Sequence, residues 1–190
     1  MTFGAAARQV FGDAIVNKFA SAAAADANRH LVSMDFLAAA FSAAHFVRLM
    51  GQTAWSSEDQ ERMLSGLVTE VRLALGAGHD EVAASRAASH QMLTTENPWT
   101  WEETEGARKA LSSIPDENDP YVSVVVAAQI ADYLLLGGPI FWSETEFHDM
   151  RSALIADFED TSGRGDDVLA ANRLAIFDVL EASLETFTMT

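Results

Sequence analysis

The sequence predicts an all-α fold of about eight helices, arranged as two similar repeats that pack around a pseudo-two-fold axis. Three observations lead to this prediction. Helix-favouring residues such as Ala, Leu, Glu and Arg dominate the chain. No segment between turn signals alternates polar and apolar residues with the period of a strand. The chain also aligns with itself, without a gap, when residues 33–93 are placed on residues 120–180.

Helix starts are indicated by side chains that can cap the first turn. Capping-box spacings occur at Ser57, Thr100 and Ser143, each with Gln or Glu three positions later. Pro120 suits the first position of a helix, and the Val-rich run that follows continues into a long apolar segment, so we interpret it as helix rather than strand. The expected helices span residues 4–25, 33–50, 57–75, 80–95, 100–112, 120–136, 144–161 and 167–188.

Helix ends are expected at glycines, because a left-handed residue after the last turn is favourable only for Gly. The candidates are Gly51, Gly76, Gly138 and Gly163. We expect several of them to have positive φ.

The internal repeat includes 17 identities among 61 aligned pairs. They fall at structural positions: Gly51 aligns with Gly138 at a helix end, and Trp55-Ser56 aligns with Trp142-Ser143 at the next start. Two units of this size leave apolar faces that bury each other. We therefore expect one compact domain over residues 1–190, built of repeats at about 1–95 and 96–190.

Composition narrows the possible functions. The formal net charge is −16 and the pI is about 4.4, which argues against binding to nucleic acid or to an anionic membrane. The chain has no cysteine, so thiol chemistry and Cys-based metal sites are excluded. No stretch of 18 uncharged apolar residues occurs, and we expect a soluble, cytoplasmic protein without a cofactor.

One set of polar residues lies in apolar surroundings in both repeats. His45 aligns with Asp132, and one helical step earlier Ser42 aligns with Gln129. A two-fold axis would bring the four together at the repeat interface, where His45 could donate to the Asp132 carboxylate. Two interpretations stay open: a site for a small molecule, or a structural pair that fixes the register of the repeats.

A weaker alternative is a metal site made of His45, His79, Asp80 and Asp132, in the order used by some metal-dependent phosphohydrolases. His79-Asp80 aligns with Asp166-Asp167, which favours a simpler role as an acidic helix start.

The tryptophans have separate expected roles. Trp55 and Trp142 precede Ser caps and fit the hydrophobic-staple position, whereas Trp99 and Trp101 flank one helix start. At least one of the latter two rings should be exposed, where it could anchor a partner.

No nucleophile elbow, phosphate loop or nucleotide fingerprint is present. We therefore expect a non-catalytic helical protein that binds a small molecule or an unknown protein partner, with a homodimer as one candidate assembly. The alternative is a metal-dependent hydrolase or small-ligand-binding enzyme that uses the His/Asp cluster at the repeat interface.

Overall fold

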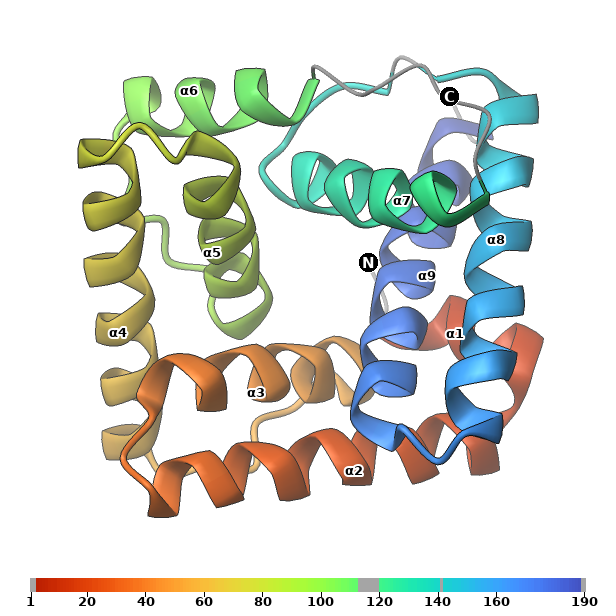
Figure 1. The fold of residues 1–190 in the computed structure, drawn as a ribbon, viewed down its shortest axis with the longest axis horizontal. Helices are drawn as coiled ribbons and strands as arrows, with labels where there is room; N and C mark the ends of the chain where they lie inside the picture. The colour runs from red at the N-terminus through yellow and green to blue at the C-terminus, as the bar shows by residue number, and fades with distance from the viewer. Residues whose placement is uncertain (1–2, 113–119, 141, 189–190) are drawn as a thin grey trace.

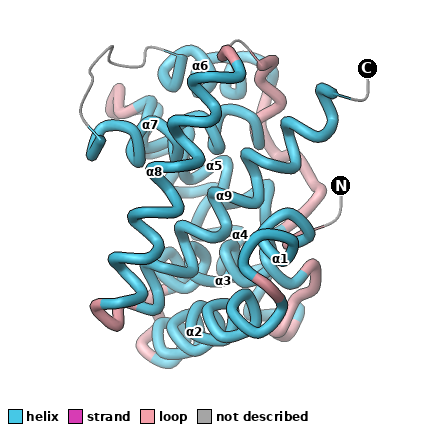
Figure 2. The backbone as a smooth tube through the Cα atoms, turned by 90° about the vertical axis from the view of Figure 1, so that its right-hand side faces the viewer, coloured by secondary structure: helices cyan, strands magenta, loops and turns pink. Residues whose placement is uncertain are grey.

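A computed structural model describes residues 3–112, 120–140 and 142–188. Over these ranges the chain forms nine helices and no strand, which confirms the all-α prediction (Figures 1 and 2). None of the described helices combines the length and apolar character needed to cross a membrane. The helices are α1 (Ala5–Phe11), α2 (Asp13–Val32), α3 (Phe36–Met50), α4 (Ser57–Gly76), α5 (Asp80–Leu93), α6 (Trp101–Ser112), α7 (Pro120–Leu135), α8 (Glu144–Gly163) and α9 (Asp167–Thr188).

The first expected helix, 4–25, is in fact two helices. Gly12 separates α1 from α2 with φ 84° and ψ 157°, a conformation that favours glycine. Helix α2 then continues past residue 25 to Val32, because no glycine or proline interrupts it. The next helix begins at Phe36 rather than at residue 33, since the Asp35 carboxylate caps it by accepting from the Ala38 amide.

The capping predictions are confirmed at two of three starts. Thr100 and Glu103 exchange reciprocal bonds at α6, and Ser143 and Glu146 form a complete capping box at α8. At α4 the cap is one residue earlier than expected. Ser56, not Ser57, accepts from the backbone amide of Asp59, three positions on.

The glycine prediction is right at one position and shifted at three. Gly51 ends α3 with φ 70°, as expected. Gly76, Gly138 and Gly163 do not have positive φ; it occurs instead at Gly78 (75°), Gly137 (77°) and Gly165 (79°). The helices α4 and α8 include Gly76 and Gly163 as their last residues, so the glycine with positive φ lies two positions later in each case.

The packing of the helices can be compared between the two aligned segments. Helices α3, α4 and α5 of the first repeat correspond to α7, α8 and α9 of the second, and α4 and α8 lie at opposite sides of the molecule (Figure 1). Helix α3 packs against α9, and the corresponding helices α7 and α5 pack against each other. The turns match as well: the amide of His79 donates to the carbonyl of Ala74, and the amide of Asp166 donates to that of Thr161. Superposition of the two units stays a prediction.

The helices 33–50 and 120–136 are not the packed central pair that their apolar sequences suggest. Helices α3 and α7 each pack against α5 and α9 rather than mainly against each other. The segment Leu174–Leu180 of α9 is buried throughout, as expected of a helix surrounded by others. The largest apolar cluster joins α9 to α1, α2, α3, α7 and α8, so the core draws on both repeats.

Candidate functional site

A pocket of about 610 Å³ lies where the two repeats meet. Its lining comes from α3 and α5 of the first repeat and from α7 and the start of α9 of the second, the four helices drawn around the middle of Figure 1. Polar and apolar side chains share the wall, which is the usual composition of a small-molecule site. The lining residues are Phe41, Ser42, His45, Ser85, Arg86, Ser89, Met92, Ala128, Asp132, Asp166, Val168, Leu169, Asn172 and Ile176.

Three of the four residues predicted to cluster line this pocket. Ser42, His45 and Asp132 belong to its wall, whereas Gln129 does not. The expected contact between His45 and Asp132 is absent, since neither an ion pair nor a hydrogen bond joins these two described residues. Each of the two side chains instead interacts with a residue of the other aligned segment: His45 with Asn172, and Asp132 with Ser85.

His45 is bound through an asparagine on α9. The Asn172 amide nitrogen lies 2.9 Å from Nε2 of His45, and the Asn172 oxygen accepts from Arg173 at 2.6 Å. That orientation makes the amide a donor to Nε2, so a neutral His45 carries its proton on Nδ1. Burial, reinforced by the charge of Arg173, lowers the pKa of His45 to about 4. The buried Nδ1 has no hydrogen-bond partner among the described residues.

The pKa of Asp132 is shifted in the opposite direction to that of His45. Burial raises the pKa of this carboxyl to about 8, although a hydrogen bond from the Ser85 side chain and the positive charge of Arg86 both oppose the shift. At neutral pH the group is therefore mostly protonated and can donate a hydrogen bond. The hydrogen bond from His45 to the Asp132 carboxylate expected from the sequence does not form, and burial favours the neutral form of each group.

The two environments correspond under the 87-residue offset of the repeat. His45 interacts with Asn172 and Arg173; Asp132 interacts with Ser85 and Arg86. In the alignment of the two segments, His45 corresponds to Asp132, Ser85 to Asn172 and Arg86 to Arg173. Contacts that cross between repeats in this reciprocal way are those expected of a pseudo-two-fold axis through the pocket.

The hydrogen-bond partner of Ser42 lies outside the pocket. The Ser42 hydroxyl donates to Asp26 of α2 at 2.5 Å, and Asp26 also forms an ion pair with Arg29. Asp26 is almost fully buried. This network ties α2 to α3 and holds Ser42 at the pocket wall.

The alternative metal set does not assemble. His79 is the exposed N-cap of α5 and Asp80 is its first residue, and neither lines the pocket that holds His45 and Asp132. In the described part of the chain, no three His, Asp or Glu side chains are placed to hold one metal ion. The acidic-start interpretation fits better at α9, where Asp166 accepts from the Leu169 amide.

A buried ion pair that sequence reasoning missed lies outside the pocket. Arg48 Nε is 2.8 Å from Asp178 Oδ2, and both side chains are inaccessible to solvent. The Asp178 carboxylate also accepts from the amides of Gly4 and Ala7, at the start of α1. An Arg inside the apolar α3 pattern and an Asp inside the apolar α9 pattern were the only signals, and neither has a charged counterpart in the other repeat.

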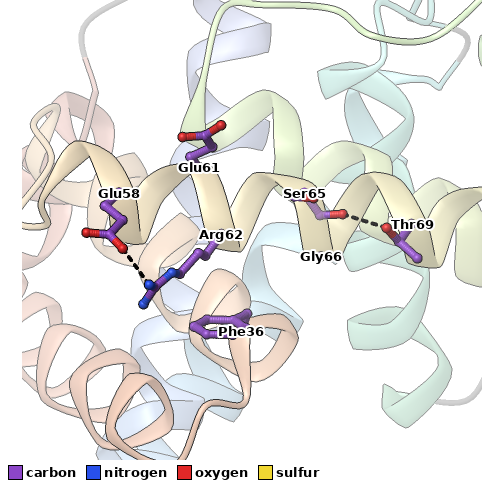
Figure 3. Close-up of a pocket in the computed structure, with 7 residues that line it drawn as sticks. All are labelled: Phe36, Glu58, Glu61, Arg62, Ser65, Gly66 and Thr69. Atoms are coloured by element: carbon purple, nitrogen blue, oxygen red, sulfur yellow. Dashed lines mark hydrogen bonds and ion pairs between the residues drawn. The ribbon is translucent and has the colours of Figure 1, made fainter.

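A second depression, along α4, is less suited to a ligand (Figure 3). Six of its seven lining residues come from α4 itself, and Phe36 supplies the other wall. Arg62 forms an ion pair with Glu58 and stacks near the Phe36 ring, and Thr69 donates to the Ser65 carbonyl. These polar groups therefore satisfy one another along the helix.

The tryptophans divide as follows. Trp142 packs on Phe147 with ring centroids 6.3 Å apart, which confirms the staple at α8. For Trp55 the staple stays a prediction: its ring contacts Phe46, and its Nε1 donates to Asn28. Trp101 is 71% exposed, as expected of one of the pair, whereas Trp99 is buried.

Comparison of the chain with family models, curated proteins and solved structures finds no match.

Proposed function

We propose that this protein is a non-catalytic binding protein that holds a small organic molecule in the pocket between its repeats. The observation that supports the proposal best is the buried Nδ1–H of His45, a donor in the pocket wall that has no hydrogen-bond partner among the described residues. Leaving a buried donor unsatisfied costs about 1–3 kcal/mol, and a ligand that accepts from it removes that cost.

Binding is favoured over catalysis by the state of the same histidine. A general base works best with a pKa near the working pH, whereas burial lowers that of His45 to about 4. Its Nε2 is also occupied by Asn172 and is unavailable to a substrate. His45 is thus suited to recognition through Nδ1.

A blocking variant tests the proposal. Ala128 lines the pocket on α7 and is equivalent to Phe41 in the first repeat, so Ala128→Phe places a second ring in the cavity. The purified protein, denatured and analysed by mass spectrometry, should release a small molecule in near-stoichiometric amount, and the variant should release little. Ala156→Phe, on the exposed side of α8, is the matched control and should behave as the unaltered protein.

A thermal-shift screen with a panel of small organic acids, amides and alcohols gives the second readout. Ligand at about 100 times its Kd stabilises the folded state by about 2.7 kcal/mol, which raises the melting temperature. Absence of any released molecule together with absence of any stabilising compound would refute the proposal, as would equal binding by Ala128→Phe.

A further inference from the structure

The chemistry of the ligand is indicated by one arginine in the pocket wall. Arg86 lies on α5 with its guanidinium carbon 4.3 Å from the centre of the Phe41 ring. Across the described part of the chain, eight of the ten arginines form ion pairs with Asp or Glu; Arg86 and the exposed Arg72 do not. Arg86 is only half-exposed, and its Nε is buried without a hydrogen-bond partner.

The repeat shows how this arginine differs from its counterpart. Arg173, the equivalent residue, binds Asp157 at 2.5 Å and also donates to Asn172. The position equivalent to Asp157 is Glu70, whose charge reaches Arg86 without an ion pair. Phe41 holds the Arg86 guanidinium instead, whereas the second repeat has the small Ala128 at that place. An unpaired cation therefore lines the pocket in a protein of net charge −16.

The neighbouring polar groups are also donors. His45 presents its unpartnered Nδ1–H, and protonated Asp132 can supply an O–H. The same wall also includes the apolar side chains of Met92, Leu169 and Ile176. A planar carboxylate accepts two parallel bonds from a guanidinium, and a neighbouring hydrocarbon group fills the apolar side.

We infer that the pocket takes a small organic acid, whose carboxylate binds Arg86 and whose apolar body packs against Met92, Leu169 and Ile176. A phosphate ester fits less well. Its second charge needs a second cation, and Arg173 is already engaged with Asp157. The exposed carboxylate of Asp166 in the same wall also disfavours a dianion. This inference rests on the proposed binding function and assigns its ligand class.

Matched pairs of probes test the inference by titration calorimetry at neutral pH. Phenylacetate and hexanoate are compared with phenylacetamide and hexanamide, and phenyl phosphate is the third arm. We expect each acid to bind at least about tenfold more tightly than its amide, and phenyl phosphate to bind more weakly than phenylacetate. Arg86→Gln should abolish the preference for the acid, and Arg86→Lys should retain part of it because the charge remains.

The control is Arg72→Gln, which removes the same charge from an exposed position on α4 and should change affinity less than twofold. Circular dichroism shows whether each variant is folded, and Arg86→Lys keeps the test decisive if the Gln variant is not. Acids and amides that bind equally well, or independently of Arg86, overturn the organic-acid assignment while pocket binding stands. Tighter binding of phenyl phosphate overturns it as well. Failure of every probe, with no co-purifying molecule, overturns the binding function itself.

Discussion

Replacing Asp132 by Asn should change how stability depends on pH. In the folded protein burial raises the pKa of this carboxyl from its ordinary 3.8 to about 8. Between these values the folded state holds a proton that the unfolded state has released. The free energy of unfolding therefore falls as pH rises, by up to 1.36 kcal/mol for each pH unit. The contribution is fully present below about pH 3.8 and is lost as pH rises through about 8.

From about pH 6 to about pH 7.5 this linkage amounts to a loss of about 2 kcal/mol. Asn cannot ionise, so the stability of Asp132→Asn should lack this loss. The difference between the two proteins removes the contribution of groups that both share. These include His45, whose lowered pKa acts in the opposite direction below about pH 6.5.

The assay is urea unfolding followed by far-ultraviolet circular dichroism at several pH values, extrapolated to zero urea. Asp166→Asn is the control, because that carboxylate lines the same pocket but is exposed, and Asn also caps helices well. Its pH profile should parallel that of the unaltered protein. Parallel profiles for Asp132→Asn would refute the argument that burial holds Asp132 protonated.

Three further predictions concern stability. Gly78→Ala should reduce the free energy of unfolding by about 1 kcal/mol in urea titrations, because its φ is 75° and no neighbouring atom limits the added Cβ; an unchanged midpoint would contradict this. Asp178→Ala should cost about 3–5 kcal/mol because it removes the carboxylate that compensates the buried charge of Arg48, and the double variant Arg48→Met/Asp178→Leu should cost less. A double variant as unstable as the single would show that the α1 contacts of Asp178 dominate. Trp101→Ala should shift stability by less than about 0.5 kcal/mol in thermal melts, since the ring is 71% exposed.

Several features of the site were predictable, and others were not, for a physical reason. Polar residues in an otherwise apolar helix pattern identified His45 and Asp132, because the cost of burying them implies a partner or a role. The same reasoning wrongly included Gln129 among the pocket residues. It aligns with Ser42, which does line the pocket, and the sequence does not distinguish the two positions. The reasoning also missed Arg86, which the pattern of its helix did not distinguish from an ordinary surface arginine. Only the contact with Phe41 and the missing carboxylate partner identify it.

Local interactions determined what the sequence could specify by itself. Helix content and the capping boxes at Thr100 and Ser143 depend on residues only a few positions apart. The tertiary structure decided which helix faces meet. Asp132 interacts with Ser85 rather than with His45, and Arg48 pairs with Asp178, which is 130 residues away in the sequence. Such contacts depend on how whole helices pack against one another, which no short stretch of sequence encodes.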